Sequence, residues 1–168
     1  MDGAAANGSL DVVQWLHRNR DEGCTANAIF LAAKNGHLDV LKVLHEVRME
    51  GCSSRAMNWA AKHGHLETVK WLHENRAEVR RGCTREAMDG AAASGHLDVV
   101  QWLHQNRQEG CSIRAMNHAA LNGHLDVVKW LHFSRKEGCT NNAMDNSAKN
   151  GHLEIVKFLH QHRKEGCR

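Results

Sequence analysis

The sequence contains neither proline nor tyrosine, and only 5% of its residues are aromatic. Because proline inside a helix costs about 3 kcal/mol, its absence favours uninterrupted helices. No run approaches the roughly 18 apolar residues that a membrane helix requires, and the N-terminal "MDGAAANGSLD" lacks the basic and apolar segments of a signal peptide. We expect neither secretion nor membrane insertion, with host-directed secretion after loss of a leader left open.

The charge balance does not indicate a strongly charged partner. The formal net charge is +3, and the basic residues are scattered through the chain with acidic residues beside them. Nucleic-acid binders instead gather lysine and arginine on one face, so DNA or RNA binding is a minor alternative. With 42% apolar residues the chain can bury a core, and we expect a soluble protein.

The chain is internally repetitive. The stretch "NGHLDVVKWLH" begins at Asn122, and Gly-Cys recurs every 28 residues, except for one step of 31 that carries an insertion within residues 76–82. Fixed periods of this size indicate a solenoid, so we expect one repeat domain spanning 1–168. Its expected repeats are 1–22 (truncated), 23–50, 51–81, 82–109, 110–137 and 138–165, with 166–168 beginning another.

Each repeat reads as a short helix followed by a longer one. In "CTREAMDGAAASG", Thr84 can cap the start of a helix and Gly95 can follow its end. In "GHLDVVQWLHQNRQEG", Asp98 lies in the first turn, Arg107 lies near the end and Gly110 follows, as the helix dipole and C-cap preferences favour. Serine or threonine fills the same cap position in the five complete repeats: Thr25, Ser53, Thr84, Ser112 and Thr140.

The pattern "AAxxGHLxVVxxL" resembles the ankyrin repeat, and the resemblance covers the whole chain. It implies an all-α solenoid of stacked helix-turn-helix repeats. The chain departs from the family where "TPLH" would stand, as Ala87, Met88 and Asp89 illustrate, and its repeats are about five residues shorter than the usual 33. The missing residues fall where ankyrin proteins carry a β-hairpin finger, so we expect that finger to be shortened or absent.

The six cysteines share one repeat position. Neighbouring helices pack about 10 Å apart, whereas a disulfide needs Cα atoms closer than about 7 Å, so successive cysteines should remain buried thiols. Thiols indicate a reducing compartment, and we expect a cytoplasmic or nucleocytoplasmic protein. No spacing is typical of a zinc site, and we expect neither metal nor other cofactor. The cysteines are Cys24, Cys52, Cys83, Cys111, Cys139 and Cys167.

Histidines and tryptophans also recur at fixed positions. The resemblance implies that the histidines after the turn glycine hydrogen-bond to the backbone of the neighbouring repeat, and we expect protonation below about pH 6 to weaken the stack. These histidines are His37, His65, His96, His124 and His152. The second-helix tryptophans are expected to be packing residues: Trp15, Trp71, Trp102 and Trp130, with Val43 and Phe158 in the same position elsewhere.

Repetition argues against catalysis. A catalytic site needs a unique constellation of nucleophile, base and orienting group, whereas each aspartate or histidine here is one of several equivalent residues. We therefore expect no enzymatic activity.

One stripe of the first helices differs from repeat to repeat. Three positions, at i, i+4 and i+7, lie on one helix face and alternate between apolar, basic and acidic residues. In ankyrin-like stacks this face lines the concave binding surface. We predict a protein-binding surface there, with Leu31 beside Trp59 as a hot spot; sequence drift at exposed positions is the alternative. The candidate residues are Leu31, Lys34, Arg55, Trp59, Lys62, Arg114, His118, Leu121, Asn146 and Lys149.

The pattern therefore predicts a non-catalytic module, monomeric, that binds a protein partner of unknown identity on its first-helix face. The alternative is a structural repeat fragment that associates end to end and has no dedicated ligand. Three irregular features are weaker binding candidates: Phe30, Phe133 and the insertion ending Val79, Arg80 and Arg81.

Overall fold

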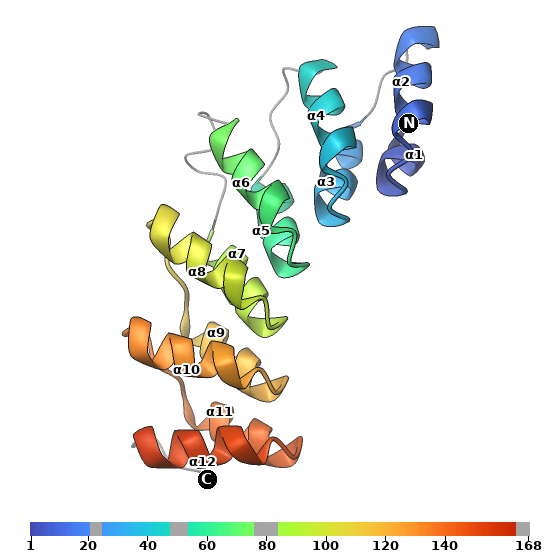
Figure 1. The fold of residues 1–168 in the computed structure, drawn as a ribbon. Coiled ribbons are helices and arrows are strands. Elements are labelled where there is room, and N and C mark those ends of the chain that lie inside the picture. Colours follow the sequence, from blue (N-terminus) through green and yellow to red (C-terminus); the bar gives the residue numbers. More distant parts are fainter. Residues whose placement is uncertain (21–24, 48–53, 76–83, 164–168) are drawn as a thin grey trace. The chain divides into compact units, whose positions relative to one another are not determined.

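The computed structural model describes residues 1–20, 25–47, 54–75 and 84–163, and every regular element in these ranges is an α-helix (Figure 1). This confirms the all-α prediction, and the described loops between helix pairs contain no β-strand. The helices are α1 (Asp2–Ala6), α2 (Leu10–Asn19), α3 (Ala26–Lys34), α4 (Leu38–Val47), α5 (Ser54–Lys62), α6 (Leu66–Glu74), α7 (Arg85–Ala93), α8 (Leu97–Asn106), α9 (Ile113–Leu121), α10 (Leu125–Ser134), α11 (Asn141–Lys149) and α12 (Leu153–His162).

The helices group into two compact units, an N-terminal unit of Met1–Thr84 and a C-terminal unit of Arg85–Arg168. Within each unit, a first helix packs against the second helix of its own repeat and against the first helices of adjacent repeats. For example, α3 contacts α1, α4 and α5, whereas α9 contacts α7, α10 and α11. Stacked first helices therefore form a continuous layer within each unit.

The first helices begin at side-chain caps. The Thr25 hydroxyl accepts a hydrogen bond from the Asn27 N–H at 3.1 Å, and Ser112 accepts one from the Arg114 N–H at the same distance. Thr140 caps α11 in the same way, at 3.3 Å from the Asn142 N–H. These contacts satisfy N–H groups that the first helical turn leaves unpaired, which confirms the cap prediction at these three positions. The predicted cap Ser53 and the insertion within 76–82 lie outside the described residues.

Histidines after the turn glycines connect neighbouring repeats. His37 Nε2 lies 3.0 Å from the Ala6 carbonyl oxygen, and His152 Nε2 lies 3.1 Å from that of Leu121, which confirms the backbone contact at these two positions. A carbonyl oxygen only accepts, so Nε2 must donate, as it can in both the neutral and the charged ring. Protonation of the ring therefore does not remove these hydrogen bonds. For this reason, the predicted loss of stability below about pH 6 does not follow from these contacts.

A second connection joins consecutive first helices. The side chain of Asp89 in α7 accepts hydrogen bonds from the Ser112 N–H at 2.7 Å and from its hydroxyl at 2.6 Å. Asn117 in α9 makes the equivalent pair of contacts with the Thr140 N–H and hydroxyl, both at 3.0 Å. The residue that caps one first helix is thereby held by the preceding one. Two further repeats carry this connection, between Asp2 and Thr25 and between Asn58 and Thr84.

Aromatic stacking joins consecutive second helices. Trp71 packs on His45 and Trp130 on His104, each with ring centroids 5.2 Å apart in an edge-to-face arrangement. Trp15 differs and is 60% exposed, so its predicted role as a packing residue is wrong. Trp71 and Trp130 instead pack on a histidine of the preceding second helix.

Candidate protein-binding surface

The candidate residues lie on α3, α5, α9 and α11, and none of them is buried. Arg55, Lys62, Arg114, His118 and Lys149 are exposed, and the other five are partly exposed. The recurring alanine and methionine positions of these helices are buried instead, as for Ala56 and Met57 in α5, except for Ala148 in α11, which is exposed. The stripe of varying residues thus lies away from the packed side of each first helix.

In the N-terminal unit, three of the predicted residues meet around one indole ring. The Lys34 ammonium group of α3 lies over the Trp59 ring, 5.1 Å from its centroid. Lys62, one turn beyond Trp59 in α5, also lies over this ring, at 4.8 Å. Cations are attracted to the negative face of an aromatic ring, so both contacts stabilise the orientation of Trp59.

The apolar neighbour of Trp59 is Phe30. The Phe30 and Trp59 rings meet edge to face with centroids 6.0 Å apart, and the Arg55 guanidinium lies over the Phe30 ring at 5.1 Å. Arg55 therefore joins the cluster through Phe30. Leu31, the predicted neighbour of Trp59, is partly exposed, and its pairing with Trp59 stays a prediction.

Phe30 had only a weak signal in the sequence. Its repeat position holds Asp2, Asn58, Asp89 and Asn117 in other repeats, all of which bond to the next cap residue. A phenyl ring cannot make such a hydrogen bond. Phe30 therefore stands where other repeats carry aspartate or asparagine. At this position an aromatic contact with Trp59 takes the place of the hydrogen bonds between repeats.

His63 completes the cluster at the end of α5. Its ring stacks on Trp59 at a centroid distance of 5.4 Å, with 27° between the planes, and its Nδ1 lies 2.9 Å from the Trp59 carbonyl oxygen. We refer to Phe30, Lys34, Arg55, Trp59, Lys62 and His63 as the Trp59 cluster. Aromatic and cationic side chains from two adjacent repeats thus converge at one place on the first-helix layer.

The other candidate residues belong to the C-terminal unit and are arranged differently. The position of Trp59 is held by His118 in α9 and by Asn146 in α11, so neither repeat can form an indole cluster. At the end of α9, the Leu121 carbonyl oxygen accepts from Asn150 Nδ2 at 2.8 Å and from His152, which fixes the adjoining turn. Arg114, His118 and Lys149 are exposed but do not form a comparable group.

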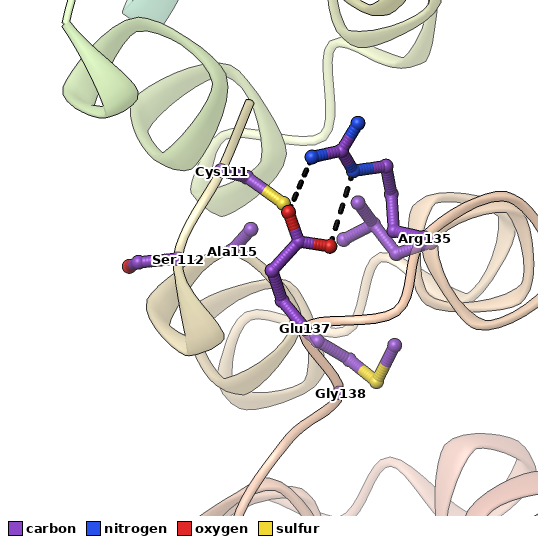
Figure 2. A pocket seen from close by; sticks show the side chains of 8 residues that line it. Cys111, Ser112, Ala115, Arg135, Glu137 and Gly138 are labelled. Atoms are coloured by element: carbon purple, nitrogen blue, oxygen red, sulfur yellow. Dashed lines mark hydrogen bonds and ion pairs between the residues drawn. The ribbon is translucent and has the colours of Figure 1, made fainter. Parts of the chain in front are cut away.

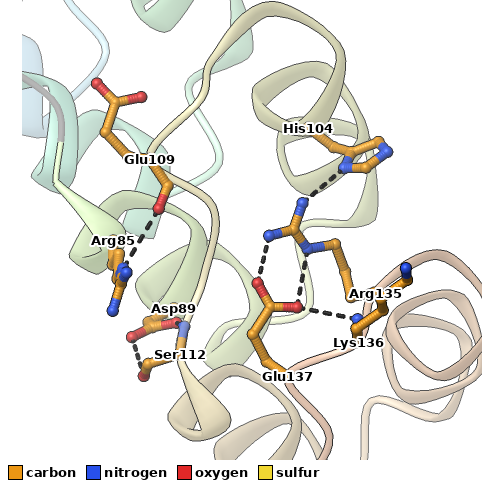
Figure 3. A network of polar contacts seen from close by, with 8 residues as sticks. All are labelled: Arg85, Asp89, His104, Glu109, Ser112, Arg135, Lys136 and Glu137. Carbon is orange, nitrogen blue, oxygen red and sulfur yellow. Dashed lines mark hydrogen bonds and ion pairs between the residues drawn. The ribbon is translucent and has the colours of Figure 1, made fainter.

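A group of polar side chains in the C-terminal unit lies in the loop after α10. Arg135 forms an ion pair with Glu137, and its Nη1 lies 3.2 Å from His104 Nδ1 (Figure 3). The Cys111 side chain points toward this ion pair, and the space between the lining residues admits no water-sized molecule (Figure 2). Arg107 and Glu109 form the equivalent ion pair one repeat earlier.

Burial and hydrogen bonding shift the pKa values of two side chains at this loop, Cys111 and Glu137. Burial, with a further contribution from Glu137, raises the pKa of the Cys111 thiol from 9.0 to about 11, despite the opposing effect of Arg135. Burial also raises the pKa of Glu137, but hydrogen bonds, chiefly from Arg135, outweigh it and leave this pKa below its usual value. A thiol with so high a pKa is a poor nucleophile at neutral pH, so the loop has the properties of a structural connection.

Among the described residues, we find neither a metal-binding group nor a membrane-spanning helix. Cys111 and Cys139 form no disulfide; Cys111 is buried as predicted, whereas Cys139 is partly exposed, so its predicted burial is wrong. The other four cysteines lie outside the described residues. Within the described part of the chain, no group of three or more His, Cys, Asp or Glu side chains could hold a metal ion. In the same ranges, no helix has the length and apolar character needed to cross a membrane.

Comparison with known proteins gives a consistent result over most of the chain. A family model described as ankyrin repeats (3 copies) matches residues 1–83, and one described as ankyrin repeats (many copies) matches residues 88–132. A search of curated proteins gives no match. Among solved structures, the human ASB11 ankyrin repeat domain is similar over 96% of this chain and 82% of that chain, with a TM-score of 0.72 and 19% sequence identity. At that identity, the likeness shows the fold.

Proposed function

This chain belongs to the ankyrin repeat family, whose repeats generally mediate protein-protein interaction, and on that premise we propose that it is a non-catalytic module that binds a protein partner on its first-helix layer. One observation carries the proposal. The first-helix positions that vary between repeats are exposed or partly exposed, whereas the recurring alanine and methionine positions of α3, α5, α7 and α9 are buried. A surface free of packing constraints can specialise for a partner.

The centre of the proposed surface is the Trp59 cluster. Tryptophan and arginine are the residues that most often dominate binding energy at protein interfaces, and here Trp59 and Arg55 lie in one cluster with their rings and cations already oriented. A side chain held in place before binding loses less conformational entropy when a partner arrives. We assign a secondary contribution to the candidate residues of α9 and α11.

The free thiols Cys111 and Cys139 support placement in a reducing compartment, which we propose to be the cytoplasm or the nucleocytoplasm. We also propose that 1–168 act as one repeat domain without cofactor, in which the repeats serve as scaffold. Catalysis forms no part of the proposal, because a catalytic site needs a unique constellation and the aspartates and histidines of the repeats recur as equivalent residues.

Capture of partners by paired variants tests the surface directly. Trp59→Ala with Arg55→Ala removes the centre of the Trp59 cluster, and Trp15→Ala with Arg18→Ala is a matched control on exposed positions of α2. Both proteins are immobilised and exposed to the same cytosolic extract, after circular dichroism has verified their helix content. We expect specific partners to be lost only with the first variant. Retention of all partners by that variant would refute the proposed surface.

End-to-end association is a second candidate, supported by exposed apolar side chains in the outermost repeats. Val12 is 48% exposed, whereas the equivalent Val40 and Val127 are each 1% exposed within the stack. Leu153 in α12 is 60% exposed. A head-to-tail contact between copies would cover both places. Sedimentation over a concentration series tests it: association that Val12→Ser abolishes supports this candidate, and a monomer at all concentrations removes it.

A further inference from the structure

No carboxylate of the described residues forms an ion pair with the three cations of the Trp59 cluster. Within the described ranges, none of Lys34, Arg55 and Lys62 forms an ion pair with a carboxylate; Lys70 in the same unit, by contrast, pairs with Glu67 at 2.7 Å. Like charges that converge without a counter-ion repel one another, and a bound anion relieves that repulsion. The cluster is therefore electrostatically complementary to negative charge.

The aromatic rings of the cluster favour the same kind of ligand. Lys34 and Lys62 lie over the Trp59 ring, His63 stacks on it, and Arg55 lies over Phe30. Cations of the chain itself thus occupy the negative ring faces, which leaves the positively polarised ring edges for a ligand. A nucleobase would need an open ring face for stacking, whereas a carboxylate can approach the edges and the surrounding cations.

We propose that the Trp59 cluster binds an acidic segment of a protein partner, with glutamate or aspartate carboxylates on Lys34, Arg55 and Lys62 and an apolar side chain against Phe30 and Trp59. This inference rests on the proposed function and specifies the chemistry of the partner. The positive charge of the cluster does not extend to α7, where Glu86, Gly90 and Ala93 occupy the positions equivalent to Arg55, Trp59 and Lys62. Among the described first helices, only the α3 and α5 pair combines an aromatic pair with three cations.

Fluorescence anisotropy with a synthetic probe tests the proposal. The probe is a fluorescein-labelled peptide of glutamates interspersed with leucines, compared with the same peptide carrying lysine in place of glutamate and with labelled oligouridylate. We expect the glutamate peptide to bind, and Lys34→Ala with Lys62→Ala to weaken its binding about 10-fold, which corresponds to about 1.4 kcal/mol for the loss of the two charge-assisted contacts together. Binding should also weaken as salt is raised.

Matched variants keep the test specific. Lys42→Ala with Lys129→Ala removes the same charge from exposed second-helix positions and should leave the affinity for the glutamate peptide unchanged. Replacement of Lys34 and Lys62 by arginine retains the cations and should restore at least half of the binding free energy lost in the alanine variant. Circular dichroism verifies that each variant is folded.

Several outcomes would overturn the inference: no affinity for the glutamate peptide, equal loss in the two lysine-to-alanine variants, or preference for oligouridylate, which would indicate a nucleic acid. These outcomes differ from a failure of the proposed function. If the glutamate peptide does not bind but partners captured from cytosol still depend on Trp59 and Arg55, the protein-binding surface stands and only its acidic specificity is wrong. If neither depends on the cluster, both proposals fall.

Discussion

Asp89 and Ser112 are joined by two hydrogen bonds from the Ser112 N–H and hydroxyl to the two carboxylate oxygens, at 2.7 and 2.6 Å. Ser112 is also the residue that caps α9, so one carboxylate in α7 fixes the start of the next first helix. The same serine thus caps its own helix and attaches its repeat to the preceding repeat.

Removal of this carboxylate should destabilise the fold. We expect Asp89→Ala to lower the free energy of unfolding by about 1–3 kcal/mol, because a hydrogen-bonded charge is lost and the Ser112 N–H is left without its partner. Urea denaturation measures the change. Asp89→Asn should remain close to the native protein, since Asn117 makes the same contacts with Thr140. The exposed Asp98→Ala is the control, and an equal effect there would contradict this role.

A turn glycine should tolerate no side chain. Gly95 has φ of +80°, and a Cβ atom there would lie 2.5 Å from His124 Nδ1. We expect Gly95→Ala to destabilise the protein by roughly 1–3 kcal/mol through backbone strain and displacement of the histidine. Thermal denaturation provides the measurement.

Gly3 is the matched control for that substitution. It lies in α1 and a Cβ there would meet nothing within 4 Å, so Gly3→Ala should stabilise by up to about 1 kcal/mol through higher helix propensity. If both alanine variants melted alike, the close contact with His124 would have no energetic role.

Stability should fall at alkaline pH because of Cys111. The folded protein holds the pKa of this thiol at about 11 by burial, against an ordinary value of 9.0. The unfolded chain therefore loses the proton first, so the stabilising contribution is complete below pH 9 and disappears between pH 9 and 11. Urea denaturation across this range should show a steeper decline for the native protein than for Cys111→Ala. Equal slopes would show that this thiol is not linked to folding.

The Arg135–Glu137 ion pair should contribute to acid unfolding. Because hydrogen bonding outweighs burial and lowers the pKa of Glu137 in the folded state, its contribution is present above the ordinary value of 4.5 and is lost as pH falls through the lower folded pKa. Glu137→Gln should therefore make unfolding less dependent on pH in the acidic range, as followed by circular dichroism. The effect is expected to be small because both side chains are partly exposed. An unchanged acid profile would contradict it.

Much of the candidate surface could be predicted from the sequence, because residues at i, i+4 and i+7 of a helix share a face wherever the helix lies. Lys34, Trp59 and Lys62 were identified in this way, and the structure brings them together. Phe30 was not assigned to that group. Its ring reaches Trp59 because of the way α3 and α5 pack, and helical periodicity within one repeat carries no information on that packing.

Trp15 illustrates the opposite error. Its sequence context matches that of Trp71 and Trp130, and local similarity predicted a similar environment. Trp71 and Trp130 are partly exposed and each packs on a histidine in the preceding second helix, whereas Trp15 is 60% exposed. The division into six repeats stays a prediction wherever a repeat boundary falls outside the described residues.

By itself the sequence determined the paired helices, their caps, their turns and the face on which variation is tolerated, because these depend on interactions between residues a few positions apart. Only the tertiary structure decided which side chains meet across repeats: Asp89 with Ser112, Phe30 with Trp59, and Cys111 with the ion pair of Arg135. Those residues are separated by 23 or more positions and become neighbours when each repeat buries its apolar side against the next.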